Sequence, residues 1–102
     1  APAYLEVNGQ VIPVRAAGIV IGRGSECDVR IDDPGVSRKH VEFRVLGEGR
    51  DADVVVVDLH STNGTVVNGA SVAHAPVRDG SQVVVGSTTI AVHSVDPRTR
   101  GV

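Results

Sequence analysis

Apolar and polar positions alternate over much of this chain of 102 residues. Between positions 41 and 45, the apolar residues Val41, Phe43 and Val45 are separated by charged ones. This alternation predicts a strand with one buried side and one side that faces solvent. The four valines at positions 54–57 are apolar on both faces, so we expect residues 54–59 to form a central strand. Because no window keeps apolar residues at helical spacing, the pattern predicts an all-β fold.

Turn-forming pairs such as Asn8-Gly9 and Asp79-Gly80 separate the apolar runs at short intervals. This rhythm is typical of a β-sandwich. β-branched residues, above all valine, are abundant, and they favour strands over helices. Further strands are expected at residues 4–7, 10–14, 19–22, 28–31, 82–85 and 88–95.

The domain boundary is expected near position 95. Residues 96–102 are poor in apolar side chains and are expected to form a frayed tail, which leaves residues 1–95 as one domain. The chain begins at Ala1 and not at Met, so we expect a piece of a longer protein. Its longest uninterrupted apolar run, Val54 to Val57, is too short to cross a bilayer, so no direct membrane contact is expected.

Charge and composition narrow the classes of partner. The formal net charge of −2 argues against a protein that binds nucleic acid without specificity. Tyr4 and Phe43 are the only aromatic residues, which argues against stacking on single-stranded nucleic acid. Cys27 is the only cysteine and cannot form an intramolecular disulfide, so a cytoplasmic setting is the expectation. The isolated domain is expected to be a monomer. With one cysteine and four scattered histidines, we expect no structural zinc site and no cofactor.

The first candidate for binding chemistry is Arg23, which follows Gly22 at the end of an apolar run and precedes Gly24. The glycines allow a tight turn and a close approach of the backbone. A guanidinium presents a fork of donors that matches two oxygens of a phosphate. The alternative is a solvated arginine in an ordinary turn. A nucleotide-binding loop is not supported, because no helix follows and no Gly-Lys-Ser/Thr is present.

The second candidate is the run Ser37-Arg38-Lys39-His40, which follows Asp33-Pro34-Gly35. Pro34 and Gly35 suit the central positions of a type II turn. The hydroxyl of Ser37 can donate to an anion, and Arg38 or Lys39 adds positive charge. The alternative is a charged loop that serves solubility. We expect His40 to hold the loop to the backbone and not to act as a catalytic base, because no G-x-S-x-G motif is present.

The third candidate is the segment from Ser61 to Thr65. Asn63 and Gly64 both tolerate left-handed backbone conformations. An asparagine side chain can donate and accept together, so it can hold the backbone of an extended peptide. The alternative is a plain polar turn. Asn68-Gly69 follows and is interpreted as a structural hairpin turn.

The order and spacing of four motifs closely resemble those of the forkhead-associated (FHA) domain, and the motif sequences look like those of actinobacterial members. The motifs are Gly22-Arg23, Ser37-Arg38-Lys39-His40, Ser61-Thr62-Asn63-Gly64-Thr65 and Asn68-Gly69. The resemblance extends from about residue 3 to residue 95. It implies an eleven-stranded β-sandwich of two mainly antiparallel sheets that binds phosphothreonine peptides through loops at one end. The implied partner is a phosphothreonine-containing protein, namely a kinase, a kinase substrate or a phosphorylated segment of the parent chain.

The resemblance also implies a role for each motif residue. Arg23 would grip the phosphate, Ser37 would donate its hydroxyl to it, Arg38 would contact it as some family members do, and Thr62 would close the pocket. Asn63 would bind the peptide main chain beyond the phosphothreonine. The architectural residues would be Gly22, His40, Gly64, Asn68 and Gly69.

Two other functions stay open at this point. One is a β-sandwich that binds proteins without any phosphate, and the other is a hydrolase that uses Ser37 or Ser61 with a histidine. Peptide selectivity is expected to come from variable loops at residues 64–66 and 70–76.

Overall fold

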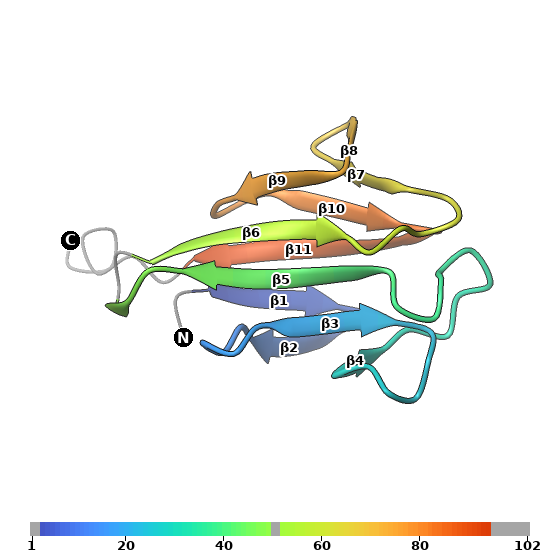
Figure 1. The fold of residues 1–102 in the computed structure, drawn as a ribbon, viewed down its shortest axis with the longest axis horizontal. Helices are drawn as coiled ribbons and strands as arrows, with labels where there is room; N and C mark the ends of the chain where they lie inside the picture. The colour runs from blue at the N-terminus through green and yellow to red at the C-terminus, as the bar shows by residue number, and fades with distance from the viewer. Residues whose placement is uncertain (1–2, 50–51, 95–102) are drawn as a thin grey trace.

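The computed structural model describes residues 3–49 and 52–94, which form eleven strands in two packed sheets (Figure 1). The predicted all-β class and the eleven-stranded sandwich are confirmed. The strands are β1 (Ala3–Val7), β2 (Gln10–Pro13), β3 (Ile19–Gly22), β4 (Val29–Arg30), β5 (Val41–Leu46), β6 (Asp53–Asp58), β7 (Thr65–Val67), β8 (Ala70–Val72), β9 (His74–Val77), β10 (Gln82–Val85) and β11 (Thr88–Ser94).

One sheet has six strands in the order β2-β1-β11-β10-β7-β8, and the other has five in the order β4-β3-β5-β6-β9. The strand pairs with a defined register are antiparallel, except that β3 and β4 run parallel. The β3–β4, β4–β5 and β6–β7 loops meet at one end of the sandwich, on the right in Figure 1. The same end carries the β10–β11 turn, because Gly86 lies against Gly35.

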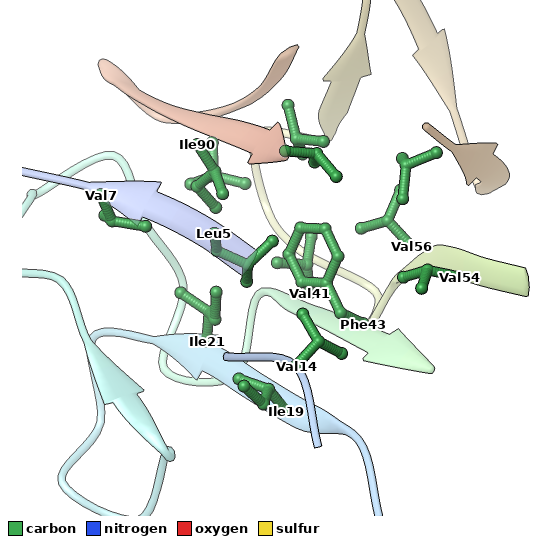
Figure 2. Packing of buried hydrophobic residues seen from close by; sticks show 14 of the residues in the cluster. Leu5, Val7, Val14, Ile19, Ile21, Val41, Phe43, Val54, Val56 and Ile90 are labelled. Atoms are coloured by element: carbon green, nitrogen blue, oxygen red, sulfur yellow. The ribbon is translucent and has the colours of Figure 1, made fainter. Parts of the chain in front are cut away.

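Phe43 is the one aromatic residue of the core and has no exposed surface. Figure 2 shows its ring among aliphatic side chains such as Leu5 of one sheet and Val56 of the other. Full burial of one such side chain stabilises the fold by about 1.5–3 kcal/mol. The alternation expected for residues 41–45 is present, because Val41 and Phe43 are fully buried while Arg44 is exposed.

The strands expected from the pattern are all present within one or two residues of their expected bounds. The central position expected for residues 54–59 is confirmed, because β6 lies between β5 and β9, although Val55 and Val57 on its outer side are only half-buried. Two loop predictions are wrong. Residues 70–76 are not a variable loop, because they form β8 and most of β9, and residues 64–66 are not one either, because Thr65–Val67 form β7.

Residues 95–102, which include the expected frayed tail and the last residue of the strand expected at 88–95, lie outside the described residues. Within residues 3–49 and 52–94, no helix could span a membrane.

Candidate functional site

The end of β3 is held against the β4–β5 loop by backbone hydrogen bonds. The amide of Arg23 donates to the carbonyl oxygen of Ser37 (2.9 Å), and the amide of Gly24 donates to that of Arg38 (3.0 Å). A methyl group at Gly22 would overlap the carbonyl oxygen of Arg38 and would lie 2.9 Å from that of Ser37. Only glycine therefore allows this approach, which brings Arg23 beside Ser37.

Three consecutive residues of the β4–β5 loop then receive side chains or amides from two other loops. The Nδ2 of Asn63 donates to the carbonyl oxygen of Gly35 (2.9 Å), and the Nε of Arg23 donates to that of Val36 (3.1 Å). The amide of Thr62 donates to the Oγ of Ser37 (3.0 Å). Arg23, Ser37, Thr62 and Asn63 are therefore gathered at one rim by the segment 35–37.

These contacts leave the donors that an anion needs. Among the described residues, Arg23 uses only its Nε, so both terminal nitrogens of the guanidinium remain for a ligand. The Oγ of Ser37 accepts a hydrogen bond, so its own proton can be donated outward. Asn63 keeps its Oδ1 and one N–H, which match an N–H and a carbonyl of an extended peptide.

His40 is fully buried beneath this rim. Its Nδ1 accepts a hydrogen bond from the amide of Ser37 (3.0 Å), so that nitrogen carries no proton. Its Nε2 lies 2.8 Å from the carbonyl oxygen of Gly64 and donates to it. Gly64 itself has a φ of +82°, a conformation that favours glycine. The neutral imidazole thus fastens the β4–β5 loop to the β6–β7 loop.

Asp33 has a structural role that the sequence did not indicate. Its carboxylate accepts hydrogen bonds from the amides of Gly35 and Ser87 and from the hydroxyl of Thr88, each at 2.8 Å. The bonds from Gly35, Thr88 and Ser87 lower the pKa of Asp33, so it is ionised at neutral pH. Asp33 therefore ties the β4–β5 loop to the β10–β11 turn of the opposite sheet.

The turn at Asp33-Pro34-Gly35 differs from the prediction. The amide of Val36 donates to the carbonyl oxygen of Asp33 (2.9 Å), so a β-turn is present. Gly35 has no positive φ, so the turn is not type II. Gly35 is needed for another reason, because a methyl group there would lie 3.0 Å from the Cα of Gly86.

Asp58 plays the corresponding part for the β6–β7 loop. It accepts hydrogen bonds from the amide and hydroxyl of Ser61 and from the hydroxyl of Thr65. Burial alone would raise the pKa of Asp58, but the hydrogen bonds from Ser61 and Thr65 outweigh it and leave the pKa lowered. Ser61 in turn accepts a hydrogen bond from the amide of Gly64, which shapes the loop that carries Asn63.

Arg38 also lies at this end, but its guanidinium is paired with the carboxylate of Glu26 at 2.9 Å. Both side chains are exposed, and a hydrogen bond from Arg38 lowers the pKa of Glu26. Solvent screens an exposed ion pair, so it contributes little to stability, and a phosphate dianion could compete for Arg38.

Asn68 and Gly69 lie away from this rim. They have φ values of +50° and +88° and form the β7–β8 turn. Asn68 accepts a hydrogen bond from the amide of Gln82 (2.9 Å), at the end of β10 opposite the β10–β11 turn.

The described residues give no support for hydrolase geometry. Both nitrogens of His40 are bonded to backbone groups, and the hydroxyl of Ser37 is bonded to the amide of Thr62. The hydroxyl of Ser61 is bonded to the carboxylate of Asp58. Among residues 3–49 and 52–94, no cluster of His, Cys, Asp or Glu could hold a metal ion.

Comparison with known proteins agrees with this geometry. The family model for the FHA domain matches residues 19–86, which include the β3–β4, β4–β5 and β6–β7 loops. The chain belongs to the FHA domain family. The motif resemblance found in the sequence is therefore confirmed at the level of the family.

Individual relatives support the same assignment. The FHA domain-containing protein FhaA of Mycobacterium tuberculosis is 38% identical over 85 residues, which cover 83% of this chain but only 15% of FhaA. A solved structure from a study of phosphothreonine-dependent FHA domain interactions superposes with a TM-score of 0.84 at 33% identity and covers 94% of this chain and 99% of that one. The MEK1 FHA domain in complex with a phosphothreonine peptide of HOP1 gives a TM-score of 0.83 at 29% identity, with the same coverage.

Proposed function

We propose that this FHA domain binds phosphothreonine in an extended peptide and that Arg23 and Ser37 hold the phosphate. The observation that carries the proposal is the convergence of three loops on residues 35–37, which leaves unused donors of Arg23, Ser37 and Asn63 at one rim. The solved relatives that are described as phosphothreonine-dependent or bound to a phosphothreonine peptide support the same ligand.

Binding by this rim is recognition and not catalysis. A phosphothreonine carries a charge of about −1.5 to −2 and three acceptor oxygens. Donors of Arg23 and Ser37 replace part of its water shell, Thr62 closes the pocket, and Asn63 fixes the register of the peptide main chain. Charge-assisted hydrogen bonds contribute about 1.5–3 kcal/mol each. After the costs of desolvation and peptide ordering, we expect a dissociation constant near the micromolar range, about −8 kcal/mol.

Arg38 has a secondary part in this scheme. The guanidinium of Arg38 already donates a hydrogen bond to the carboxylate of Glu26. To contact the phosphate, Arg38 must either give up this bond or bind both anions together. We therefore assign the larger share of the affinity to Arg23, which has no such competitor among the described carboxylates.

The proposed partner is a phosphothreonine-containing protein, either a Ser/Thr kinase, its substrate or a phosphorylated segment of the parent chain. Because the single cysteine gives the domain no need for an oxidising compartment, we also propose a cytoplasmic location. The chain spans only a small part of the length of FhaA.

The test is a calorimetric titration with one peptide in two forms, with threonine or phosphothreonine at the same position. We expect micromolar binding of the phosphorylated form and no measurable binding of the other. Equal binding of both forms would refute the proposal and favour a phosphate-independent interaction.

A further inference from the structure

The arginines of the described residues fall into two groups according to their counter-ions. Three are paired with a carboxylate and three pair with none of the described carboxylates. The pairs are Arg15–Asp28, Arg38–Glu26 and Arg44–Glu42, and the other three arginines are Arg23, Arg30 and Arg78.

Two of these three uncompensated arginines lie together. Arg30 is the last residue of β4 and stands in register with Gly22, one position before Arg23. Its Nε donates to the carbonyl oxygen of Arg23 (3.0 Å), which places its guanidinium next to the arginine that grips the phosphate. Arg30 is exposed, and its two terminal nitrogens remain for a ligand.

The nearby acidic residues do not neutralise this pair of arginines. Glu26 and Asp28 belong to the β3–β4 loop, between Arg23 and Arg30, but they are bound by Arg38 and Arg15. The sequence next to Arg30 also contains Asp32, which is exposed and forms no ion pair with a described cation. Acidic residues thus lie near Arg23 and Arg30 in the sequence, but none of the described carboxylates pairs with either arginine, which leaves both open to an external anion.

Contacts and strand order also show on which side of Arg23 the residue Arg30 lies. Arg30 bonds to Arg23, Arg23 bonds to Val36, and Asn63 bonds to the preceding Gly35. In the five-stranded sheet, β4 lies on one side of β3 while β5 and β6 lie on the other. Arg30 and Asn63 therefore stand on opposite sides of the phosphate-gripping arginine.

We propose that Arg30 forms a second anion subsite, which takes an acidic group on the N-terminal side of the phosphothreonine. The proposal rests on the proposed function, in which Asn63 holds the main chain on the C-terminal side. The acidic group is a carboxylate side chain or a second phosphate, since the fork of a guanidinium fits both.

The test uses synthetic phosphothreonine peptides that differ at one flanking position. Each position from −3 to +3 carries glutamine, glutamate or a second phosphothreonine in turn, and calorimetry gives the affinity for the wild-type domain, Arg30→Gln and Arg78→Gln. Arg78 is the matched control, because it is exposed and follows β9 at the end of the sandwich opposite the β10–β11 turn.

We expect the wild-type domain to prefer glutamate over glutamine about fivefold at one N-terminal position. A second phosphate there should give a larger preference, because its charge is greater and its oxygens are more numerous. Arg30→Gln should abolish both preferences and leave the affinity for the glutamine peptide within about twofold of the wild-type value, while Arg78→Gln should keep both preferences. A preference for the second phosphate alone would identify a doubly phosphorylated peptide as the ligand.

Three results would overturn the proposal while phosphothreonine binding itself stands. They are no preference at any N-terminal position, a preference that survives Arg30→Gln, and an equal weakening of all peptides by Arg30→Gln. The last would make Arg30 a support for Arg23 only. If no phosphothreonine peptide binds the wild-type domain, the proposed function fails and the second subsite fails with it. Thermal melting of each variant verifies that it is folded.

Discussion

At the scale of single residues, the site depends on polar side chains that each form one internal hydrogen bond and keep donors for the ligand. Arg23 and Asn63 reach the segment 35–37 from different loops and stop at its carbonyl oxygens. Ser37 is fixed from below by His40 and from the side by the amide of Thr62. The rotamers are thus set before the peptide arrives, which reduces the entropy lost on binding.

His40 gives the clearest separation between stability and binding at this scale. His40→Ala empties a fully buried position and leaves the amide of Ser37 and the carbonyl of Gly64 without this partner, so we expect a loss of about 2–4 kcal/mol in the free energy of unfolding. Arg23→Ala removes an exposed side chain and should change that free energy by less than about 0.5 kcal/mol. Denaturant unfolding measures both. Equal stability of the two variants would argue against the architectural role of His40.

The motif residues could be predicted from the sequence, whereas their anchors could not. Arg23 and Asn63 belong to short patterns with glycines at fixed offsets, which a reader can find without coordinates. Asp33 looks like an ordinary turn residue, because its partners Ser87 and Thr88 follow 54 and 55 positions later. Nothing local in the sequence reports a hydrogen bond across that separation.

At the scale of elements, the glycines decide how closely the loops approach. Gly22 ends β3 where the strand passes beneath the carbonyls of Ser37 and Arg38, and Gly86 lies against Asp33 and Gly35. Both contacts bring together loops that are distant in the sequence. A side chain at either position would separate Arg23 or Asp33 from the segment that it holds.

Gly22→Ala tests this close approach. The added methyl group forces the β4–β5 loop away from β3, so we expect a loss of about 1–3 kcal/mol in the free energy of unfolding. Phosphopeptide affinity should fall as well, because Arg23 and Ser37 move apart.

Gly80→Ala is the matched control for that variant. It is strained by a φ of +87°, but it meets no atom within 4 Å and precedes the end of β10 opposite the β10–β11 turn. It should lose stability without losing affinity. If Gly22→Ala binds as tightly as Gly80→Ala, the approach of β3 is not what assembles the site.

The elements that escaped prediction are short and depend on their neighbours. β7 and β8 have three residues each, too few for a period of two to be recognised. β9 contains Pro76, which argues against a central strand, but β9 is an edge strand, where proline is tolerated. The outer face of β6 is half-buried, because no further layer of the described residues covers that face of the sheet, and four consecutive valines alone do not show which face is the outer one.

At the scale of the whole molecule, two carboxylates connect the binding end to the scaffold. Asp33 joins the β4–β5 loop to the other sheet, and Asp58 shapes the β6–β7 loop from the end of β6. Both have lowered pKa values because they accept several hydrogen bonds. Two of the three loops that form the rim therefore depend on groups that must stay ionised.

This dependence predicts a particular response to acid. A carboxylate whose pKa is lowered by folding stabilises the protein fully when the pH is above the ordinary pKa, which is 3.8 for an aspartate. That contribution is lost as the pH falls through the lower pKa of the folded state. The melting temperature of Asp58→Asn should lie several degrees below that of the wild-type domain at pH 7. The difference should shrink below about pH 4. Asp32→Asn, at an exposed position, is the control. A wild-type advantage over Asp58→Asn that is independent of pH would contradict the assignment.

The most direct test of the account is a calorimetric titration of one phosphothreonine peptide into four folded proteins: the wild-type domain, Arg23→Ala, Ser37→Ala and the distant control Arg78→Ala. Each of the first two variants removes a donor to the phosphate, so we predict that both weaken binding about 10- to 100-fold or more. Their melting temperatures should stay close to that of the wild-type domain, and Arg78→Ala should bind normally. Unchanged affinity in both Arg23→Ala and Ser37→Ala would contradict the claim that the rim at residues 35–37 receives the phosphate.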